Sequence, residues 1–96
     1  MRAVVVITDS EAMKAFERAF LDGGTRGFTI LPTVAGRGRT GLKTGDRVHP
    51  GGSSLLFTVL PDGELAGTLD FLRGVRDRAG VAEATKIYVA AVDEVA

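Results

Sequence analysis

The sequence predicts an α+β fold in which two helices cover one face of an antiparallel sheet. Three observations lead to this prediction: the expected elements follow the order β-α-β-β-α-β, both expected helices have amphipathic spacing, and Pro32 interrupts the second expected strand. Proline cannot donate to a central ladder, so that strand belongs at a sheet edge. With 96 residues the chain can form one core, and we expect a single domain over 1–96.

The first three elements follow from local patterns. Residues 3–7 (AVVVI) form a β-branched run, which predicts a strand buried on both faces. Thr8 and Glu11 have the spacing of a capping box, which predicts that a helix begins there, and Gly23 ends it. The next strand is expected over 27–34. The apolar positions expected on the buried side of the helix are Ala12, Phe16, Ala19 and Phe20.

The second half of the chain has the same order of elements. Strands are expected over 53–60 and 86–92, with a helix between them that ends at Gly80. The two halves also align weakly at an offset of 53, which places Val4 with Phe57. Two halves of this kind make the ferredoxin-like split βαβ fold.

The expected strands are apolar on both sides, although this fold has helices on only one face of its sheet. Strands in such a sheet should alternate between apolar and polar residues. Residues 4–7, 55–57 and 87–90 do not alternate. The uncovered face would exceed the apolar area that a soluble monomer usually exposes. We therefore expect a homo-oligomer that is joined through its sheets.

The composition excludes several functional classes. Twelve basic and twelve acidic residues give zero net charge, so no overall field favours a nucleic acid or an anionic membrane. Aromatic residues make up 6% of the chain and tryptophan is absent, which argues against a base-stacking surface. The chain has no cysteine and no apolar run of membrane-spanning length. We expect a cytoplasmic protein with no nucleic-acid partner and no membrane insertion.

A glycine-rich segment separates the second and third expected strands. Residues 36–52 hold six of the 13 glycines and show no periodicity, which predicts a long irregular loop at about 36–53. Its net charge is +3, which leaves −3 for the rest of the chain. The charged residues are Arg37, Arg39, Lys43 and Arg47 against Asp46. Such a loop suits a phosphate or an acidic partner surface, and a solvated hairpin tip is the alternative interpretation.

The sequence contains no complete catalytic motif. Residues 36–41 match G-x-G-x-x-G and 36–44 approach a Walker A loop, but both motifs need a following helix, which Gly45 and Pro50 exclude. His49 is the only histidine, and one histidine without cysteines does not make a metal site within one chain. The serines lack a neighbouring base, so we expect no enzyme activity.

Three segments resemble the PII-like signal-transduction (nitrogen regulatory protein P-II) superfamily, in a short-loop divergent branch. Residues 34–39 (VAGRGR) are similar to its V-x-G-x-G-R stretch, 48–57 to its H-P-G…LF segment, and 86–95 to its last strand. The chain departs from the family at Thr40, where the family has glutamine. It also departs at 80–86 (GVAEATK), where the family has a glycine-rich segment before the lysine.

The resemblance implies a regulatory homotrimer with inward-facing sheets and with ATP, ADP or AMP in clefts between subunits. No further cofactor is implied, and the 36–53 loop would contact a target protein, for which a membrane transporter is one candidate. Thr29 would lie on the adenine side and Lys86 would be the phosphate lysine. The other implied nucleotide-site residues are Gly36, Arg37, Gly38, Arg39 and Thr40, and the implied partner-loop residues are Lys43, Arg47 and His49.

An alternative function from a different class fits the same architecture. A trimeric metal-responsive protein of the divalent-cation-tolerance type would use His49 as its ligand, with several copies of the chain around one metal. Loss of metal binding on replacement of His49 would favour this alternative over a nucleotide sensor.

Overall fold

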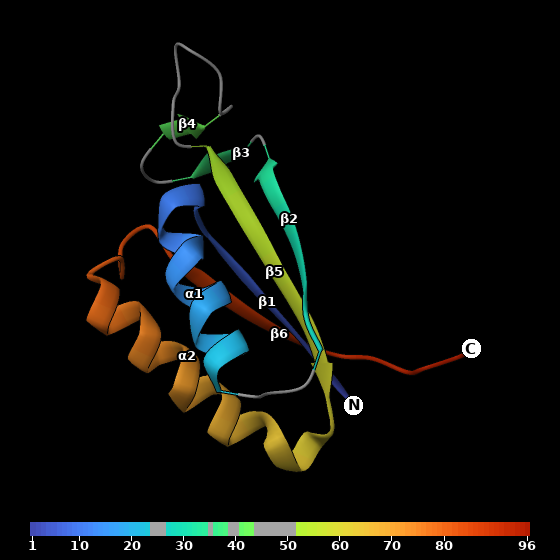
Figure 1. Cartoon of the computed structure of the whole chain (residues 1–96). Coiled ribbons are helices and arrows are strands. Elements are labelled where there is room, and N and C mark those ends of the chain that lie inside the picture. Colours follow the sequence, from blue (N-terminus) through green and yellow to red (C-terminus); the bar gives the residue numbers. More distant parts are fainter. Residues whose placement is uncertain (24–26, 35, 39–40, 44–51) are drawn as a thin grey trace.

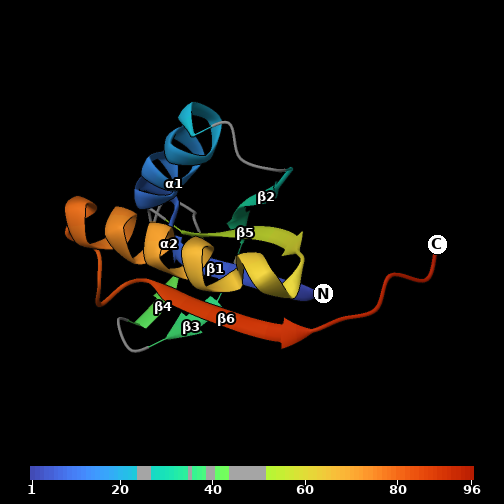
Figure 2. The same cartoon turned by 90° about the horizontal axis from the view of Figure 1, so that it is seen from below.

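The computed structural model describes residues 1–23, 27–34, 36–38, 41–43 and 52–96 (Figure 1). A four-stranded sheet has the order β2-β5-β1-β6, and each neighbouring pair is antiparallel. Both helices lie on the same face of this sheet (Figures 1 and 2). The elements are β1 (Arg2–Asp9), α1 (Ser10–Asp22), β2 (Thr29–Val34), β3 (Gly36–Gly38), β4 (Gly41–Lys43), β5 (Ser53–Leu60), the 3₁₀ turn η1 (Asp62–Glu64), α2 (Leu65–Ala79) and β6 (Lys86–Ala91). The predicted α+β, ferredoxin-like fold is confirmed.

The core lies between the two helices and the sheet face that they cover. Alternate residues of β1 and β5 enter it, because successive side chains of a strand point to opposite faces. The ring of Phe20 contacts those of Phe28 and Phe71, at centroid distances of 5.2 and 5.6 Å. The buried apolar cluster consists of Val4, Val6, Met13, Phe16, Phe20, Leu56, Leu60, Leu72 and Val75. Met13 belongs to this core although the spacing argument did not select it.

The edge position predicted for the proline-containing strand is confirmed. β2 is an outer strand and pairs only with β5 among the described elements. Its register shifts between Leu31 and Val34, the stretch that contains Pro32. A proline cannot supply a ladder hydrogen bond, so an edge strand with an irregular register accommodates it.

The first helix begins within the predicted segment, but Thr8 does not cap it; the predicted end of the second helix is confirmed. α1 begins at Ser10 with Asp9 as its N-cap residue. Thr8 remains in β1 with 1% of its surface exposed, and its Oγ1 lies 2.8 Å from Oγ1 of Thr85. The buried hydroxyl is therefore satisfied by a distant residue and not by the helix. α2 ends at Ala79, and its C-cap residue is Gly80, whose φ of +69° gives the left-handed cap that favours glycine. Among the described residues, no helix has both the length and the apolar character that crossing a bilayer requires.

The prediction that 36–52 lacks secondary structure is wrong for six residues. β3 and β4 form a short antiparallel ladder in which Gly36 is opposite Lys43 and Gly38 is opposite Gly41. Glycines carry no side chain to mark a strand, so the alternation that identifies strands in a sequence is missing here.

The sequence alignment of the two halves does not correspond to equivalent strand positions. Val4 is fully buried under the helices, whereas Phe57, its partner at the offset of 53, is 39% exposed on the other face. When strands are apolar on both faces, a sequence alignment that is shifted by one residue still pairs apolar residues with apolar residues, so the shift cannot be recognised from the sequence.

Candidate functional site

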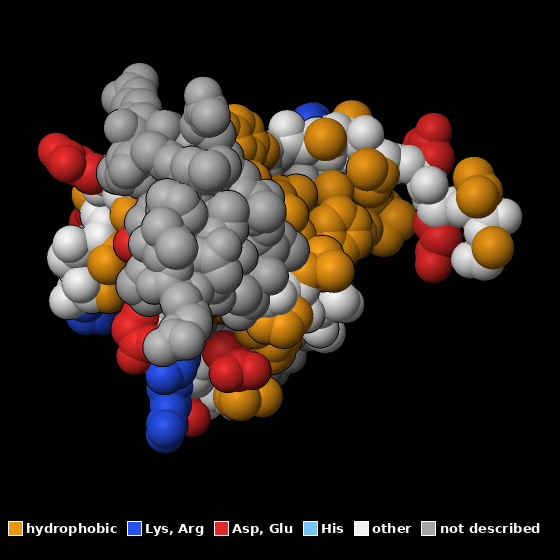
Figure 3. Space-filling view, turned by 90° about the horizontal axis from the view of Figure 1, so that it is seen from above, with side chains coloured by type: hydrophobic (Ala, Val, Ile, Leu, Met, Phe, Trp, Pro, Cys, Tyr) orange, Lys and Arg blue, Asp and Glu red, His pale blue; other side chains and the backbone are white. Residues whose placement is uncertain are grey.

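The sheet face turned away from the helices is apolar, and among the described residues several of its large side chains are exposed. Val5 of β1 is paired with Phe57 of β5 on one side and with Tyr88 of β6 on the other. Phe57 is 39% exposed, Tyr88 56% and Leu31 51%. We call this surface the open face. Strand alternation places on it Ala3, Val5, Ile7, Leu31, Leu55, Phe57, Val59, Tyr88 and Ala90. Figure 3 shows hydrophobic side chains gathered in one area beside the C-terminal segment.

Thr29 and Lys86 are both exposed, and they lie at opposite edges of the sheet. Thr29 belongs to β2 and pairs with Phe57, whereas Lys86 belongs to β6 and pairs with Ile7. Two inner strands separate β2 from β6, so these residues are about 14 Å apart across the sheet at about 4.8 Å per strand. The structure therefore does not bring these two predicted site residues together within one chain.

Lys86 lies at the end of the sheet from which the glycine-rich segment leaves. β5 begins at Ser53, which pairs with both Asp9 and Val34, the last residues of β1 and β2. Lys86 begins β6 opposite Ile7, only two residues from the end of β1. One end of the sheet therefore holds the base of the glycine-rich segment and the lysine that the sequence selected.

The loop residues selected from the sequence are described only in part. Gly36, Arg37 and Gly38 form β3, and Lys43 is the last residue of β4. The backbone of these residues is ordered as a narrow ladder next to the end of β2. Four other predicted site residues lie outside the described residues: Arg39, Thr40, Arg47 and His49.

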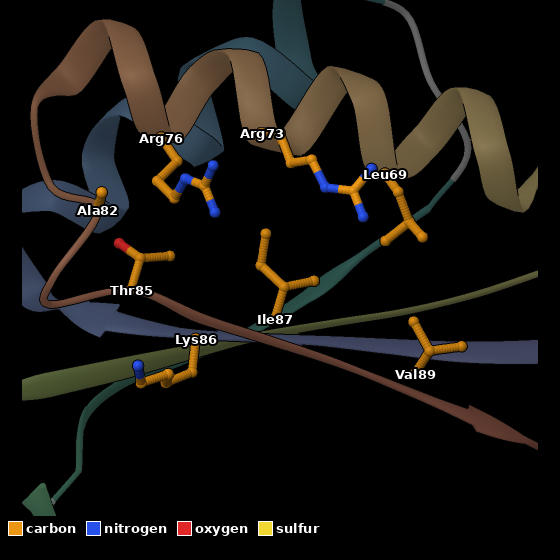
Figure 4. A pocket seen from close by; sticks show the side chains of 8 residues that line it. All are labelled: Leu69, Arg73, Arg76, Ala82, Thr85, Lys86, Ile87 and Val89. Atoms are coloured by element: carbon orange, nitrogen blue, oxygen red, sulfur yellow. The ribbon is translucent and has the colours of Figure 1, made fainter.

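A groove of about 380 Å³ lies between α2 and β6 (Figure 4). Arg73 and Arg76 extend from α2 into it, and Ile87 points toward them from the strand. Lys86 leaves β6 on the opposite side, toward the open face, as strand alternation requires (Figure 4). The groove therefore presents two guanidinium groups along an apolar floor.

The two groove arginines were not selected from the sequence. Arg73 Nη1 lies 3.5 Å from Asp70 Oδ1, and Arg76 Nε donates to Asp77 Oδ1 at 3.0 Å. The sequence signal was their spacing of three residues beside the apolar positions of the helix, which places both on one side. Their partners are exposed carboxylates, so these ion pairs contribute little to stability.

The N-terminal amine and Arg2 surround Asp62 at the other end of the sheet. Asp62 Oδ1 lies 3.1 Å from the amine and 3.4 Å from Arg2 Nε. The hydrogen bond and positive charge of the amine, followed by the charge of Arg2, lower the pKa of Asp62 below its usual 3.8. This cluster is an exposed ion pair at a helix start, and it is remote from Lys86.

The described residues contain no grouping of three or more His, Asp or Glu side chains that could hold a metal ion. His49, on which the metal-responsive alternative depends, lies outside them.

Comparison with known families identifies the class of protein that this fold represents. The family described as nitrogen regulatory protein P-II matches residues 1–96. The chain therefore belongs to the nitrogen regulatory protein P-II family, which confirms the resemblance inferred from its motifs. The matching family is not that of the divalent-cation-tolerance alternative. A search of curated proteins found no match.

Solved structures share the fold at low sequence identity. Two structures of CPII, a nitrogen regulatory PII-like protein from Thiomonas intermedia K12 bound to ADP, AMP and bicarbonate, are similar to this chain. The first has a TM-score of 0.70 and 14% identity, with 93% of this chain and 82% of that chain covered. The second has a TM-score of 0.65 and 19% identity, with 92% and 86% covered. At these identities the likeness establishes the fold alone.

Proposed function

We propose that the chain, acting as one domain in the cytoplasm, is a non-catalytic regulatory protein that senses an adenine nucleotide. Three copies assemble through their open faces, and the nucleotide binds in a cleft between two copies. Thr29 of one copy lies on the base side and Lys86 of the next on the phosphate side. Arg37, Arg39 and the glycines of 36–38 also contact phosphate, while the 36–53 segment contacts a target protein.

The single observation that carries this proposal is the position of Thr29 and Lys86 on opposite sheet edges. Two residues of one site that lie about 14 Å apart across a sheet can meet on one ligand when neighbouring copies place their β2 and β6 edges together. The apolar open face supports this assembly, because side chains such as Tyr88 and Phe57 lose their contact with water there.

The location of Lys86 and the composition of the glycine-rich segment support a phosphate ligand. Glycines permit close approach of backbone N–H groups to phosphate oxygens, and Lys86 adds a positive charge at the same end of the sheet. The related CPII protein, which shares this fold, was solved with ADP, AMP and bicarbonate. Adenine nucleotides are therefore the first ligands to test.

Calorimetric titration with ATP, ADP and AMP tests binding directly. Replacement of Lys86 by alanine removes a charge-assisted contact to phosphate, and we expect a loss of affinity of about ten- to hundredfold. Lys14→Ala is the matched control, because this exposed lysine lies on α1, outside the sheet. The absence of heat with all three nucleotides would contradict the nucleotide part of the proposal.

Mixed assemblies test whether each site spans two copies. Thr29→Tyr fills the base side and Lys86→Ala removes the phosphate contact, so neither variant alone should bind with wild-type affinity. In trimers coexpressed from equal amounts of both variants, about a quarter of the clefts should pair an intact Thr29 with an intact Lys86. Recovery of that fraction of wild-type sites supports the proposal, and no recovery would place the site within one chain.

A further inference from the structure

Three buried hydroxyl groups form a row across the sheet, beneath the helices and next to Lys86. Ser54 of β5 is opposite Thr8 of β1, and the β1/β6 register extended by one residue places Thr85 on the other side of Thr8. Ser54 is 2% exposed, Thr8 1% and Thr85 4%. Oγ1 of Thr8 lies 2.8 Å from Oγ1 of Thr85, and Ser54 Oγ donates to Ser10 Oγ at 2.9 Å.

The hydrogen bond between two of these hydroxyl groups helps to specify the β1/β6 register, which the apolar residues of β6 specify poorly. Residues 87–90 are apolar on both faces of the strand, so hydrophobic burial alone distinguishes poorly between the observed register and one shifted by a single residue. The Thr8–Thr85 bond does distinguish them, since a shift would leave a buried hydroxyl without its partner, which costs free energy. The bond therefore helps to fix the β1/β6 register at the point where β6 begins, together with the cost of turning the charged Lys86 into the core.

The register decides where the lysine points. Thr85 and Ile87 face α2, whereas Lys86 between them leaves the strand on the other side (Figure 4). A shift of one residue would turn Lys86 toward the core and Ile87 outward. Within the 80–85 connection, the Val81 side chain packs against the core, and two backbone turns form in which Val81 N–H donates to Arg76 O and Ala84 N–H to Val81 O, both at 3.2 Å. Those bonds do not reach β1.

We infer that Thr85, through its hydrogen bond to Thr8, is a positioning residue that holds Lys86 on the open-face side of β6 for contact with a phosphate group. This inference rests on the proposed function. It adds that the phosphate contact depends on a buried pair of threonines 77 residues apart in the chain. Thr85 itself does not touch the ligand.

The experiment is a double-mutant cycle on ADP affinity, measured by calorimetry. Thr85→Val keeps the shape and removes the hydroxyl, and we expect about a three- to tenfold loss of affinity. Thr85→Ser restores the hydroxyl, and its affinity should lie within about twofold of the wild type. In the Lys86→Ala background, Thr85→Val should cause no further loss, because the contact that it positions is already absent.

Thr58→Val provides a matched control. Thr58 is also a buried threonine, 2% exposed, whose Oγ1 donates to the carbonyl oxygen of Gly27 at 2.8 Å. Any effect of this variant on ADP affinity should be the same with and without Lys86. Thermal unfolding of all variants verifies that they fold.

Tyr88 gives a second measurement that needs no ligand. It is the only tyrosine, and the chain has no tryptophan, so the near-ultraviolet circular dichroism of tyrosine reports the surroundings of β6. Thr85→Val should alter this signal and Thr85→Ser should not.

The outcomes separate the positioning role from the proposed function. Equal losses from Thr85→Val with and without Lys86, or no loss at all, would overturn the positioning role and leave nucleotide sensing intact. An unchanged affinity in Lys86→Ala would overturn both the assignment of Lys86 and the role of Thr85. If the wild type binds no ADP, the proposed function fails, and an unchanged tyrosine signal in Thr85→Val would then overturn the register role as well.

Discussion

Phe57 and Tyr88 lie on either side of Val5 on the open face, each directly opposite it in the strand pairing. Both aromatic rings are substantially exposed, at 39% and 56%, on a surface that the chain's own helices do not cover. Aromatic side chains contribute large apolar areas to interfaces, so this pair marks the centre of the expected contact between copies.

Phe57→Asp should separate the copies. A carboxylate placed at the centre of an apolar interface is desolvated without a partner, and we expect a weakening of about 3 kcal/mol or more per interface. Light scattering coupled to size exclusion would then show a monomer where the wild type shows an oligomer. Leu21→Asp is the control, because Leu21 is 64% exposed but belongs to α1. An unchanged mass for Phe57→Asp would contradict assembly through the open face.

Leu72→Ala should destabilise the fold strongly. Leu72 is fully buried in the cluster between α2 and the sheet, so truncation leaves a cavity and costs about 2–5 kcal/mol in the free energy of unfolding. Urea unfolding at one fixed protein concentration measures this, since association adds to the apparent stability. Leu21→Ala, at an exposed position, should change the free energy of unfolding by less than about 0.5 kcal/mol. Similar costs for the two leucines would argue against the placement of Leu72.

Replacement by alanine should change the free energy of unfolding in opposite directions at Gly67 and Gly80, although both have space for a Cβ atom. At both Gly67 and Gly80 an added Cβ would meet no atom within 4 Å. Gly67 lies within α2, where alanine should stabilise by about 0.5–1 kcal/mol. Gly80 has φ +69°, which a Cβ disfavours, so alanine should destabilise by about 1–2 kcal/mol. Thermal melts of both variants decide this, and a stabilising Gly80→Ala would rule out the left-handed cap.

Asp62 should add an acid-sensitive contribution to stability. Its pKa is lowered in the folded chain, chiefly by the hydrogen bond and charge of the N-terminal amine, so folding favours the carboxylate. That contribution is fully present above the ordinary value of 3.8 and is lost as the pH falls through the lower folded value. Asp62→Asn should therefore be less stable than the wild type at pH 7, with the difference narrowing below about pH 4. A difference that does not depend on pH would contradict the ion pair.

Local patterns predicted most of the fold. Pro32 indicated an edge strand, Gly80 a helix end, and the doubly apolar strands an uncovered face, because each depends on residues that are near one another in the chain. The candidate site was predicted less completely. Arg73 and Arg76 line a groove only because β6 packs beside α2, which no local pattern reveals.

Sequence by itself determined which segments form the two helices and the four strands of the main sheet, that one sheet face is apolar, and that the chain resembles the P-II family. Tertiary structure alone decided which of these residues meet. It placed Thr29 and Lys86 on opposite edges of the sheet. It also brought the hydroxyl of Thr8 into a hydrogen bond with that of Thr85, so this hydroxyl does not cap the helix that follows. The physical reason is that local propensity acts over a few residues, whereas strand order and register pair residues as far apart in the chain as Arg2 and Ala91.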